Sequence, residues 1–504
     1  MSPSRYSSPP IPGLPVGIKR QAARGVLWSA AGNWGYQLST FVIFVVLSRL
    51  LTPSAFGTLA LATTFTTFTH VLSEQGLADA IIQRREIDRR QLDTVFWTNI
   101  FVAVALMAAL MASAPTISST FDDPDLGPVL FWLSIALPIT SLQTVQRAIL
   151  TKQMAFASLA LRSTVASVIG GGAGIVAAFS GLGVWSLVIQ DLASATANTV
   201  TIWTVSNWRP GLSFSFLDFK SLSRFGVNVL GFKILQFFTR RSDDLLIGYF
   251  LGPVALGIYT VAYRLLRIMI NVTTNVIGAV AFPAFSRIQH QPQRVKKAYV
   301  KSVGMTGFIA FPAFIGVIVI APELVPAFFG ERWLDAVPVM QVLSLAGLLE
   351  AVLFAPGVVM KALGKPSWRL AIAVVTTLFA IGAFLIVARL GIVAVAIAFA
   401  VVNYLLAPAA IVAARRLTGV DFRSIGRRIM APLLGAIGMA AAILALKIPL
   451  SEAPFTSQVV AYVVLGVLAY LGLVRLLDRD LWSEAKELSR LALPRRKPAA
   501  GETS

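Results

Sequence analysis

Long apolar segments, each bounded by charged residues, glycine or proline, recur fourteen times along this 504-residue chain. An α-helix needs about 20 such residues to cross the hydrocarbon core of a bilayer. Charged residues make up only 13% of the chain, against roughly 25% in an ordinary soluble domain. We therefore expect an all-α integral membrane protein with about 14 transmembrane helices, and the composition excludes a conventional water-soluble enzyme. The expected spans lie near residues 26–47, 55–74, 95–113, 128–149, 159–180, 184–205, 226–251, 254–282, 302–321, 336–359, 370–388, 392–413, 430–446 and 456–474.

Successive connections between these spans are alternately rich and poor in lysine and arginine. Both residue types concentrate in short cytoplasmic loops of membrane proteins, so the alternation predicts cytoplasmic N- and C-termini. Of the 43 lysine and arginine residues, 34 fall on this side, four on the opposite side and five within the spans. A basic membrane face thus accounts for the net charge of +20, and we expect no nucleic-acid partner.

Residues 51–62 are similar to residues 251–262 after a shift of 200 positions. Each copy follows one span, precedes another, and is succeeded by a basic loop. Chance similarity among abundant small residues is the alternative. An even number of intervening spans gives both copies the same orientation, so we expect two six-helix lobes in parallel repeat plus two C-terminal helices. The matching residues are Leu51, Pro53, Ala55, Gly57 and Ala62 with Leu251, Pro253, Ala255, Gly257 and Ala262.

This repeat divides the chain into six parts. We expect a cavity between the lobes, where transporters of this plan hold their cargo, and alternating access as the mechanism. The parts are a disordered cytoplasmic tail (1–25), an N-lobe (26–206), a cytoplasmic linker (207–225), a C-lobe (226–413), helices 13 and 14 (430–475) and a basic cytoplasmic tail (476–504).

Ionisable residues occur at helical spacing within the seventh and eighth spans. Such groups are costly in the membrane and usually line a cavity or pair with one another. Five cations against two carboxylates give an excess of +3, which predicts a binding site for an anionic cargo. The alternative is structural pairing of Arg241 with Asp244, and of Asp243 with Arg240 or Arg264. The expected cargo-binding residues here are Lys233, Arg240, Arg241, Arg264, Arg267 and Asn271.

The first half of the chain carries the opposite charge within its spans. Glu74 lies on one stripe with Thr63, Thr66 and His70, and Asp191 lies in the sixth span. Because no cation is plainly available to them, Glu74 and Asp191 are candidates for proton or sodium coupling. In the alternative interpretation, Glu74 belongs to the membrane interface and Asp191 is a helix-packing residue.

Other motifs are weak indicators of chemistry. The glycines at 170–172 and 174 lie within a span and lack the Gly-Lys-Ser/Thr ending of a phosphate loop, so they predict close helix packing. Asp122, Asp123 and Asp125 resemble a metal-binding cluster, but the neighbouring prolines favour a helix-breaking turn. Without cysteine the chain has no thiolate for a metal. We expect no metal, no cofactor and no catalytic constellation.

Three stretches of the sequence resemble one known family. They are LSRLLTPSAFGTLALATTF continuing through EQGLADAIIQRREIDRRQLDTVFWTN, then RRSDDLLIGYFLGPVALGIYTVAYRLLR, and AFPAFSRIQ. Together they resemble the oligosaccharide flippases of polysaccharide synthesis, the Wzx-type branch of the multidrug/oligosaccharidyl-lipid/polysaccharide exporter superfamily. The similarity is dense over residues 25–300 and looser beyond.

The resemblance implies a V-shaped helical fold and a transporter, not an enzyme. Its expected cargo is a polyprenyl-pyrophosphate-linked oligosaccharide repeat unit, moved from the inner to the outer leaflet of the bacterial cytoplasmic membrane for exopolysaccharide or O-antigen synthesis. The pyrophosphate would meet the basic C-lobe residues, while Arg49 of the LSRLLTP stretch would guide release at the outer mouth. The expected partners are membrane lipid and, as candidates left open, a polysaccharide polymerase and export proteins.

Three alternatives share parts of this pattern. A lipid-linked peptidoglycan-precursor flippase has the same fold and an anionic cargo, so only the three stretches quoted above distinguish it from a Wzx-type flippase. A drug-cation antiporter should carry acidic residues in its cavity, which the +3 excess disfavours. A membrane-embedded sugar polymerase usually has a large outer loop, and no outer connection here exceeds about 20 residues.

Overall fold

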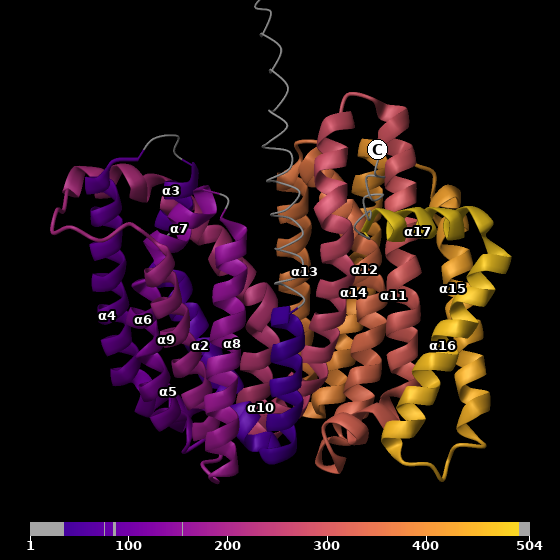
Figure 1. Ribbon diagram of the computed structural model, residues 1–504, viewed down its shortest axis with the longest axis horizontal. Helices are drawn as coiled ribbons and strands as arrows, with labels where there is room; N and C mark the ends of the chain where they lie inside the picture. The colour runs from indigo at the N-terminus through magenta and orange to yellow at the C-terminus, as the bar shows by residue number, and fades with distance from the viewer. Residues whose placement is uncertain (1–34, 75, 84–86, 154, 493–504) are drawn as a thin grey trace, which may run out of the picture. The chain divides into compact units, whose positions relative to one another are not determined.

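Helices joined by short turns make up nearly all of the described chain (Figure 1). The computed structural model describes residues 35–74, 76–83, 87–153 and 155–492. No strand occurs within these ranges. The expected disordered tail at 1–25 lies outside the described residues. Part of the expected C-terminal tail is helical, because residues 479–492 form the amphipathic helix α17.

The expected spans overlap helices in the described part of the chain, although the span at 128–149 is broken into α5, α6 and α7 and the span at 26–47 begins outside the described residues. By length and hydropathy ten helices there could cross a membrane, or up to 11 if one bent pair counts as a single span. Three additions to these eleven spans give the fourteen expected: the shorter apolar helix Gly35–Leu50, helix α9, and the second arm of α10 counted apart from the first. The helices are Gly35–Leu50, α2 (Pro53–Glu74), α3 (Leu77–Gln83), α4 (Arg89–Thr120), α5 (Leu126–Ser134), α6 (Ala136–Ser141), α7 (Thr144–Lys152), α8 (Phe156–Phe179), α9 (Trp185–Val205), α10 (Phe216–Ile288), α11 (Pro292–Phe328), η1 (Glu331–Trp333), α12 (Ala336–Ala362), α13 (Pro366–Val387), η2 (Ala388–Leu390), α14 (Ile392–Thr418), α15 (Phe422–Lys447), α16 (Phe455–Leu477) and α17 (Arg479–Ala492).

A kink divides α10 where the sequence places the boundary between two spans. Gly252 has φ 78° and ψ −178°, a conformation that favours glycine because a side chain would clash with the backbone. Pro253 follows directly and can begin a helix because its ring fixes φ near the helical value. In the first copy of the repeat, Pro53 likewise begins α2.

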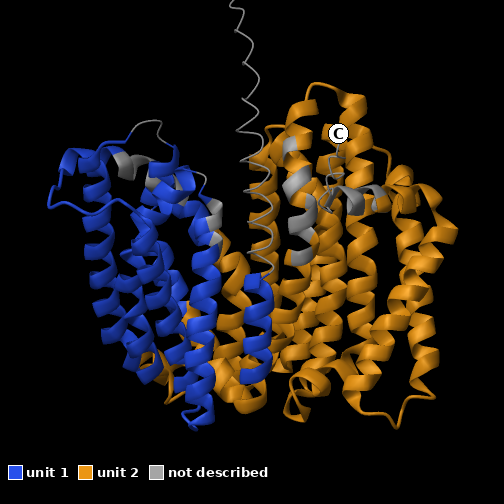
Figure 2. Cartoon of the chain, in the orientation of Figure 1, with its two compact units in different colours: residues 1–47, 65–115, 128–234 blue, residues 48–64, 116–127, 235–504 orange. Residues whose placement is uncertain are grey.

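The chain forms two compact units, which Figure 2 shows in different colours. Unit 1 contains residues 1–47, 65–115 and 128–234. Unit 2 contains residues 48–64, 116–127 and 235–504. Residues 48–64 and 116–127 thus cluster with the second half of the chain, although the sequence repeat assigns them to the N-lobe.

Glycines of α8 allow close packing of helices within unit 1. A Cβ atom built on Gly170 would lie 1.9 Å from Ser194 Oγ of α9, and one on Gly174 would lie 2.8 Å from Gln190 Cβ. Small residues spaced four apart let two helix backbones approach in this way. The glycine stretch is therefore a packing element, as the sequence predicts.

The segment before α10 is anchored to α4 by one carboxylate. Asp93 accepts hydrogen bonds from the backbone N–H of Gly211 at 3.0 Å and from the Ser213 hydroxyl at 2.7 Å. Helix α10 then begins at Phe216. The expected linker 207–225 is consequently half extended chain and half helix.

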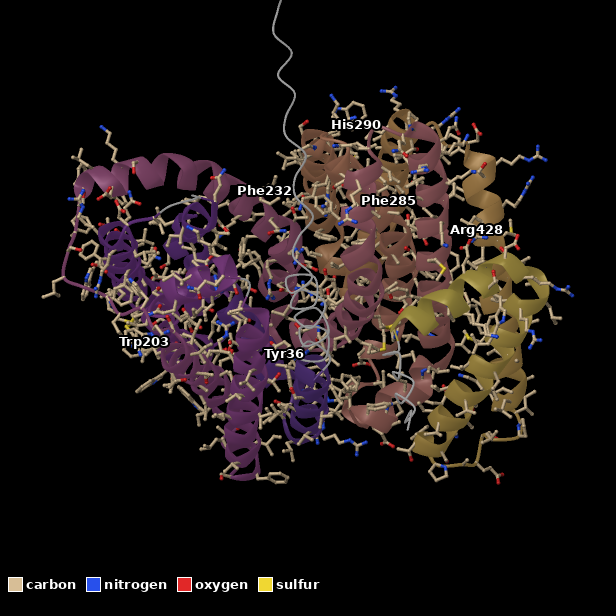
Figure 3. All side chains as sticks on the ribbon, turned by 45° about the horizontal axis from the view of Figure 1, so that its top comes forward. Tyr36, Trp203, Phe232, Phe285, His290 and Arg428 are labelled. Atoms are coloured by element: carbon tan, nitrogen blue, oxygen red, sulfur yellow. The ribbon has the colours of Figure 1, made fainter. Side chains whose placement is uncertain are left out.

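In unit 2 the core lies between α11 and its neighbours α12 and α15. Phe285 of α10 and Tyr299 of α11 are buried in one cluster (Figure 3). Trp333 of η1 is fully buried, and its indole N–H donates to the Ser48 carbonyl at 2.9 Å. An indole buried with a hydrogen-bond partner packs without leaving an unsatisfied donor.

The two copies of the sequence repeat contact each other within unit 2. A Cβ atom on Gly57 would lie 1.7 Å from the carbonyl oxygen of Pro253, and one on Gly257 would lie 1.8 Å from the carbonyl oxygen of Pro53. Residue 57 meets 253 while 257 meets 53, which is the reciprocal pattern of a twofold axis. This reciprocal contact agrees with the repeat in the sequence, and it shows that glycine is required at both positions by close backbone contact.

Helix α17 is held to α15 by one arginine. Arg428 pairs with Asp478 at 3.3 Å and also with Glu484 of α17 (Figure 3). The Arg428 side chain is only 16% exposed. Ion pairs with low exposure fix geometry more firmly than surface pairs do.

Candidate cargo and ion-coupling sites

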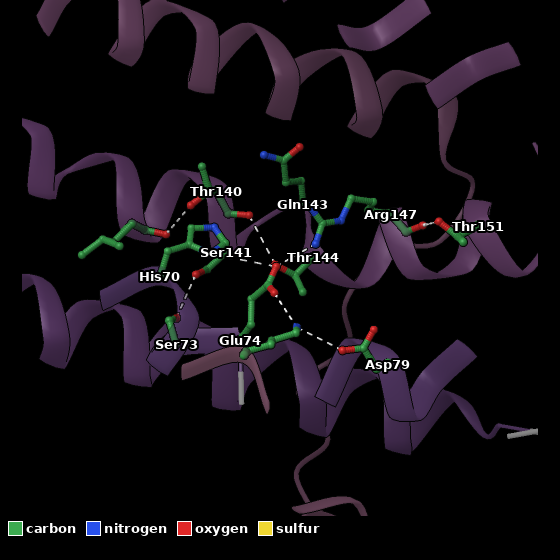
Figure 4. A network of polar contacts seen from close by, with 12 residues as sticks. His70, Ser73, Glu74, Asp79, Thr140, Ser141, Gln143, Thr144, Arg147 and Thr151 are labelled. Atoms are coloured by element: carbon green, nitrogen blue, oxygen red, sulfur yellow. Dashed lines mark hydrogen bonds and ion pairs between the residues drawn. The ribbon is translucent and has the colours of Figure 1, made fainter. Parts of the chain in front are cut away.

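Glu74 is the centre of a charged cluster within unit 1 (Figure 4). Its carboxylate lies 2.7 Å from the Arg147 guanidinium and 2.9 Å from the Lys233 ammonium. Lys233 also contacts Asp79 at 3.0 Å, and His70 Nδ1 lies 3.9 Å from Glu74. Two cations therefore share two carboxylates, with the histidine at the edge.

This cluster revises two sequence interpretations. The sequence left Glu74 without an available cation, whereas the fold brings Arg147 of α7 and Lys233 of α10 against it. The sequence grouped Lys233 with the arginines that follow it, but its charge is paired in unit 1. In the sequence, Arg147 is 73 positions and Lys233 is 159 positions from Glu74. Helical spacing relates only residues within one helix, so it could not predict these pairs.

In unit 2, three charged residues of α10 are already paired. Arg241 Nη1 lies 2.7 Å from Asp244 Oδ2, which is the structural pairing that the sequence offers as an alternative. Asp243 accepts a hydrogen bond from the Tyr259 hydroxyl at 3.0 Å and another from the Asp244 backbone N–H at 3.0 Å. Both carboxylates are buried. Buried charges persist where such partners satisfy them.

Arg240 and Arg267 belong to the two arms of α10 on either side of the kink. At 1.5 Å per residue they lie roughly 18 Å and 22 Å along the helix from Gly252. Arg240 is exposed, and no hydrogen bond or ion pair within 4 Å joins it to another described residue. The Arg267 guanidinium lies 5.2 Å from the centre of the Tyr263 ring, a cation–π arrangement, and Asp244 and Asp243 also attract it.

Glu350 is a functional candidate that the sequence reasoning missed. It lies in α12 and interacts electrostatically with Arg240 and Arg267. Its side chain remains exposed and has no ion pair within 4 Å among the described residues. One acidic residue within an otherwise apolar span was the available signal, because an ionisable group at that depth is a functional hypothesis by default.

The remaining expected residues are placed as follows. Arg49 donates through Nε to the Phe328 carbonyl at 2.8 Å and through Nη2 to the Ala327 carbonyl, so it caps the C-terminus of α11. Asn271 is half-buried on α10, and Asp191 is half-buried on α9. Arg264, like Asp191, takes part in a polar or electrostatic contact.

The acidic stretch 122–125 forms a turn. Asp123 Oδ2 accepts from the Thr58 hydroxyl at 2.6 Å, and Asp123 Oδ1 accepts from the backbone N–H of Asp125 at 3.1 Å. Asp122 has φ 49°, a value that aspartate tolerates in turns. Within the described ranges no group of three metal-ligating side chains comes together.

Residues 46–338 match the model of a family described as polysaccharide biosynthesis protein. The match covers more than half of the chain. The chain belongs to this family. The charged residues 49, 74, 191, 233, 240, 241, 264 and 267, and Asn271, all lie within the matched segment.

Two relatives in the family are similar over about two thirds of the chain. The lipopolysaccharide biosynthesis protein WzxC of Escherichia coli is 27% identical over 67% of this chain and 69% of its own length. The succinoglycan biosynthesis transport protein ExoT of Rhizobium meliloti is 28% identical over 65% of this chain and 66% of its own length.

The fold is similar to that of a solved membrane transporter. The lipid II flippase MurJ in an inward closed conformation aligns with TM-score 0.75 over 90% of this chain and 99% of that chain, at 12% identity. At this identity the likeness shows the fold alone. Family and fold together make the chain a multi-pass membrane transporter of the flippase type, not an enzyme.

Proposed function

We propose that this protein translocates a polyprenyl-pyrophosphate-linked oligosaccharide repeat unit from the cytoplasmic to the outer leaflet of a bacterial cytoplasmic membrane. The translocated unit would serve exopolysaccharide or O-antigen synthesis, and alternating access would carry it across. The names of WzxC and ExoT, which concern lipopolysaccharide and succinoglycan synthesis, support this cargo class over a peptidoglycan precursor.

The proposal rests on which charged residues of unit 2 are paired with one another. Arg241, Asp243 and Asp244 satisfy one another and Tyr259 at 2.7–3.0 Å. Arg240 and Arg267 have no ion pair within 4 Å among the described residues, although Asp243 and Asp244 attract Arg267 and Glu350 attracts both arginines. With Arg264 counted, four arginines of α10 stand against Asp243, Asp244 and Glu350. A net charge of +1 therefore remains near these residues, in a setting where charge attracts strongly.

Guanidinium groups suit a pyrophosphate for geometric reasons. Each presents a planar fork of N–H donors that can bind two phosphate oxygens at once. A diphosphate linking a lipid to a sugar carries about two negative charges, one for each arginine. We propose that Arg240 and Arg267 bind the two phosphates, and that Arg264 and Asn271, on the same stripe of α10, contact the adjoining sugar.

The cluster in unit 1 has a separate proposed role. Glu74, with Arg147, Lys233 and His70 around it, would exchange partners as a coupling ion enters, and Asp191 is the second carboxylate proposed for coupling. The ion itself would be a proton or sodium. We also propose that both termini of the chain are cytoplasmic, as the distribution of lysine and arginine predicts.

The experiment removes the two charges that carry the proposal. In a strain whose own gene is deleted, Arg240→Ala with Arg267→Ala should abolish surface polysaccharide and cause lipid-linked repeat units to accumulate. The control removes two exposed arginines outside the site, with Arg416→Ala and Arg475→Ala, and should restore polysaccharide. Immunoblotting of membranes confirms equal protein. Normal polysaccharide from the site variant would refute the cationic site.

A further inference from the structure

Glu350 faces α10 on one defined side of α12. Gly347, Glu350 and Phe354 are three and four residues apart, so they share one face of this helix. A Cβ atom on Gly347 would lie 2.5 Å from Leu266 Cδ1 of α10, and one on Gly278 of α10 would lie 2.9 Å from Phe354 Cζ. Both neighbours of Glu350 on this face therefore pack against α10.

The segment of α10 between these two contacts carries polar groups. Leu266 marks its beginning and Gly278 its end, and Arg267 and Asn271 lie between them. Glu350 lies between the corresponding points of α12. The electrostatic interaction of Glu350 with Arg267 and with Arg240 agrees with this placement.

The other carboxylates of unit 2 in this region are already bound. Asp244 is paired with Arg241 at 2.7 Å, and Asp243 accepts from the Tyr259 hydroxyl. Both aspartates also attract Arg267. Glu350 is a further carboxylate, from a different helix, that interacts with Arg240 and Arg267 and has no ion pair within 4 Å among the described residues. Four arginines of α10 (240, 241, 264 and 267) against Asp243, Asp244 and Glu350 leave the whole group at +1.

We propose that Glu350 is the internal counter-ion of Arg240 and Arg267, which an anionic cargo must displace in order to bind. This inference rests on the proposed function and adds a residue that determines specificity. While the site is empty, the carboxylate lowers the cost of holding two guanidinium groups within the membrane. When a diphosphate arrives, its oxygens replace the carboxylate as the partners of the arginines.

Displacement sets a threshold on the charge of the cargo. A lipid joined to its sugar through one phosphodiester carries one negative charge, as the carboxylate does, whereas a diphosphate linkage carries two and engages both arginines. The same carboxylate can recapture the arginines after translocation, which favours release. Glu350 therefore acts through the arginines as a positioning residue and favours diphosphate-linked lipids over monophosphate lipids.

The test measures binding of farnesyl diphosphoglucose and farnesyl phosphoglucose, which differ by one phosphate and one negative charge, to the purified full-length protein in detergent. Glu350→Gln removes the charge but keeps the size of the side chain. We expect this variant to bind the diphosphate roughly tenfold more tightly, to prefer it less over the monophosphate, and to transport more slowly because release is hindered. Glu331→Gln, which neutralises an exposed carboxylate of η1, should bind both ligands as the wild type does.

A thermodynamic cycle separates this role from a purely structural one. The effect of Glu350→Gln should vanish when Arg240→Ala and Arg267→Ala are also present, because the two arginines for which the carboxylate and the diphosphate compete are then absent. Equal or weaker diphosphate binding by Glu350→Gln would overturn the counter-ion role. If the arginine variant abolishes binding and polysaccharide export while Glu350→Gln changes neither, only this inference fails. If the wild type does not bind the diphosphate and the arginine variant still exports polysaccharide, the proposed function fails with it.

Discussion

Substitution of Gly57 or Gly257 by alanine tests the reciprocal contact between the two copies of the repeat. The new methyl carbon would lie 1.7 Å from the Pro253 carbonyl oxygen in one case and 1.8 Å from the Pro53 carbonyl oxygen in the other. Real Cβ atoms essentially never approach within 3.0 Å, so the backbones must separate by at least 1.3 Å at Gly57. Because the obstructing atoms belong to the main chain, no side-chain rotation can relieve the clash.

The expected cost follows from overpacking in a close-packed interior. Insertion of one methylene typically costs 1–3 kcal/mol, and we expect about 3 kcal/mol at each position because rigid backbone must move. Thermal unfolding of the purified protein in detergent should show a lowered midpoint for each variant. The double variant should cost less than the sum of the two, since one separation of the backbones relieves both clashes.

Gly382 provides the matched control for these variants. It lies in α13, is exposed, and has no atom within 4 Å of a Cβ built on it. Gly382→Ala should be neutral or stabilise the helix by up to about 1 kcal/mol. If Gly57→Ala and Gly257→Ala were as stable as this control, the close contact between the repeats would be refuted.

Three further predictions concern the cluster in unit 1, the topology and α17. Glu74→Gln should destabilise the protein by about 1–3 kcal/mol by leaving Arg147 and Lys233 without their shared carboxylate, and should alter the ion dependence of transport; an unchanged ion profile would remove Glu74 from coupling. Reporter domains fused after Arg90 and after Asp123 should show opposite sidedness, and matching signals would contradict the proposed topology. Arg428→Ala should increase amide hydrogen exchange within α17, whereas Arg427→Ala, at the exposed neighbouring position, should not; equal protection in both would show that the ion pairs do not hold this helix.

The spans and the repeat could be predicted because their signals are local. A run of about 20 apolar residues is sufficient to define a crossing, and Gly252 followed by Pro253 marks the break within α10 by backbone geometry alone. The similarity of residues 51–57 to 251–257 predicted the repeat. It did not predict that the copies contact each other, because contact depends on how helices pack.

The partners of charged residues could not be predicted from spacing. Glu74 meets Arg147 and Lys233 only because separate helices of unit 1 converge on it. Arg49 donates to carbonyls at the end of α11, almost 280 residues further along the chain. An acidic residue within the apolar helix α12 is visible in the sequence, but the relation of Glu350 to Arg267 appears only when α12 is packed on α10.

A cryo-electron microscopy map of the full-length protein with farnesyl diphosphate bound would examine the cargo site most directly. We expect density for two phosphates against the guanidinium groups of Arg240 and Arg267, with the Glu350 carboxylate turned away from them. Phosphate density at Arg147 and Lys233, with Arg240 and Arg267 still facing Glu350, would contradict it.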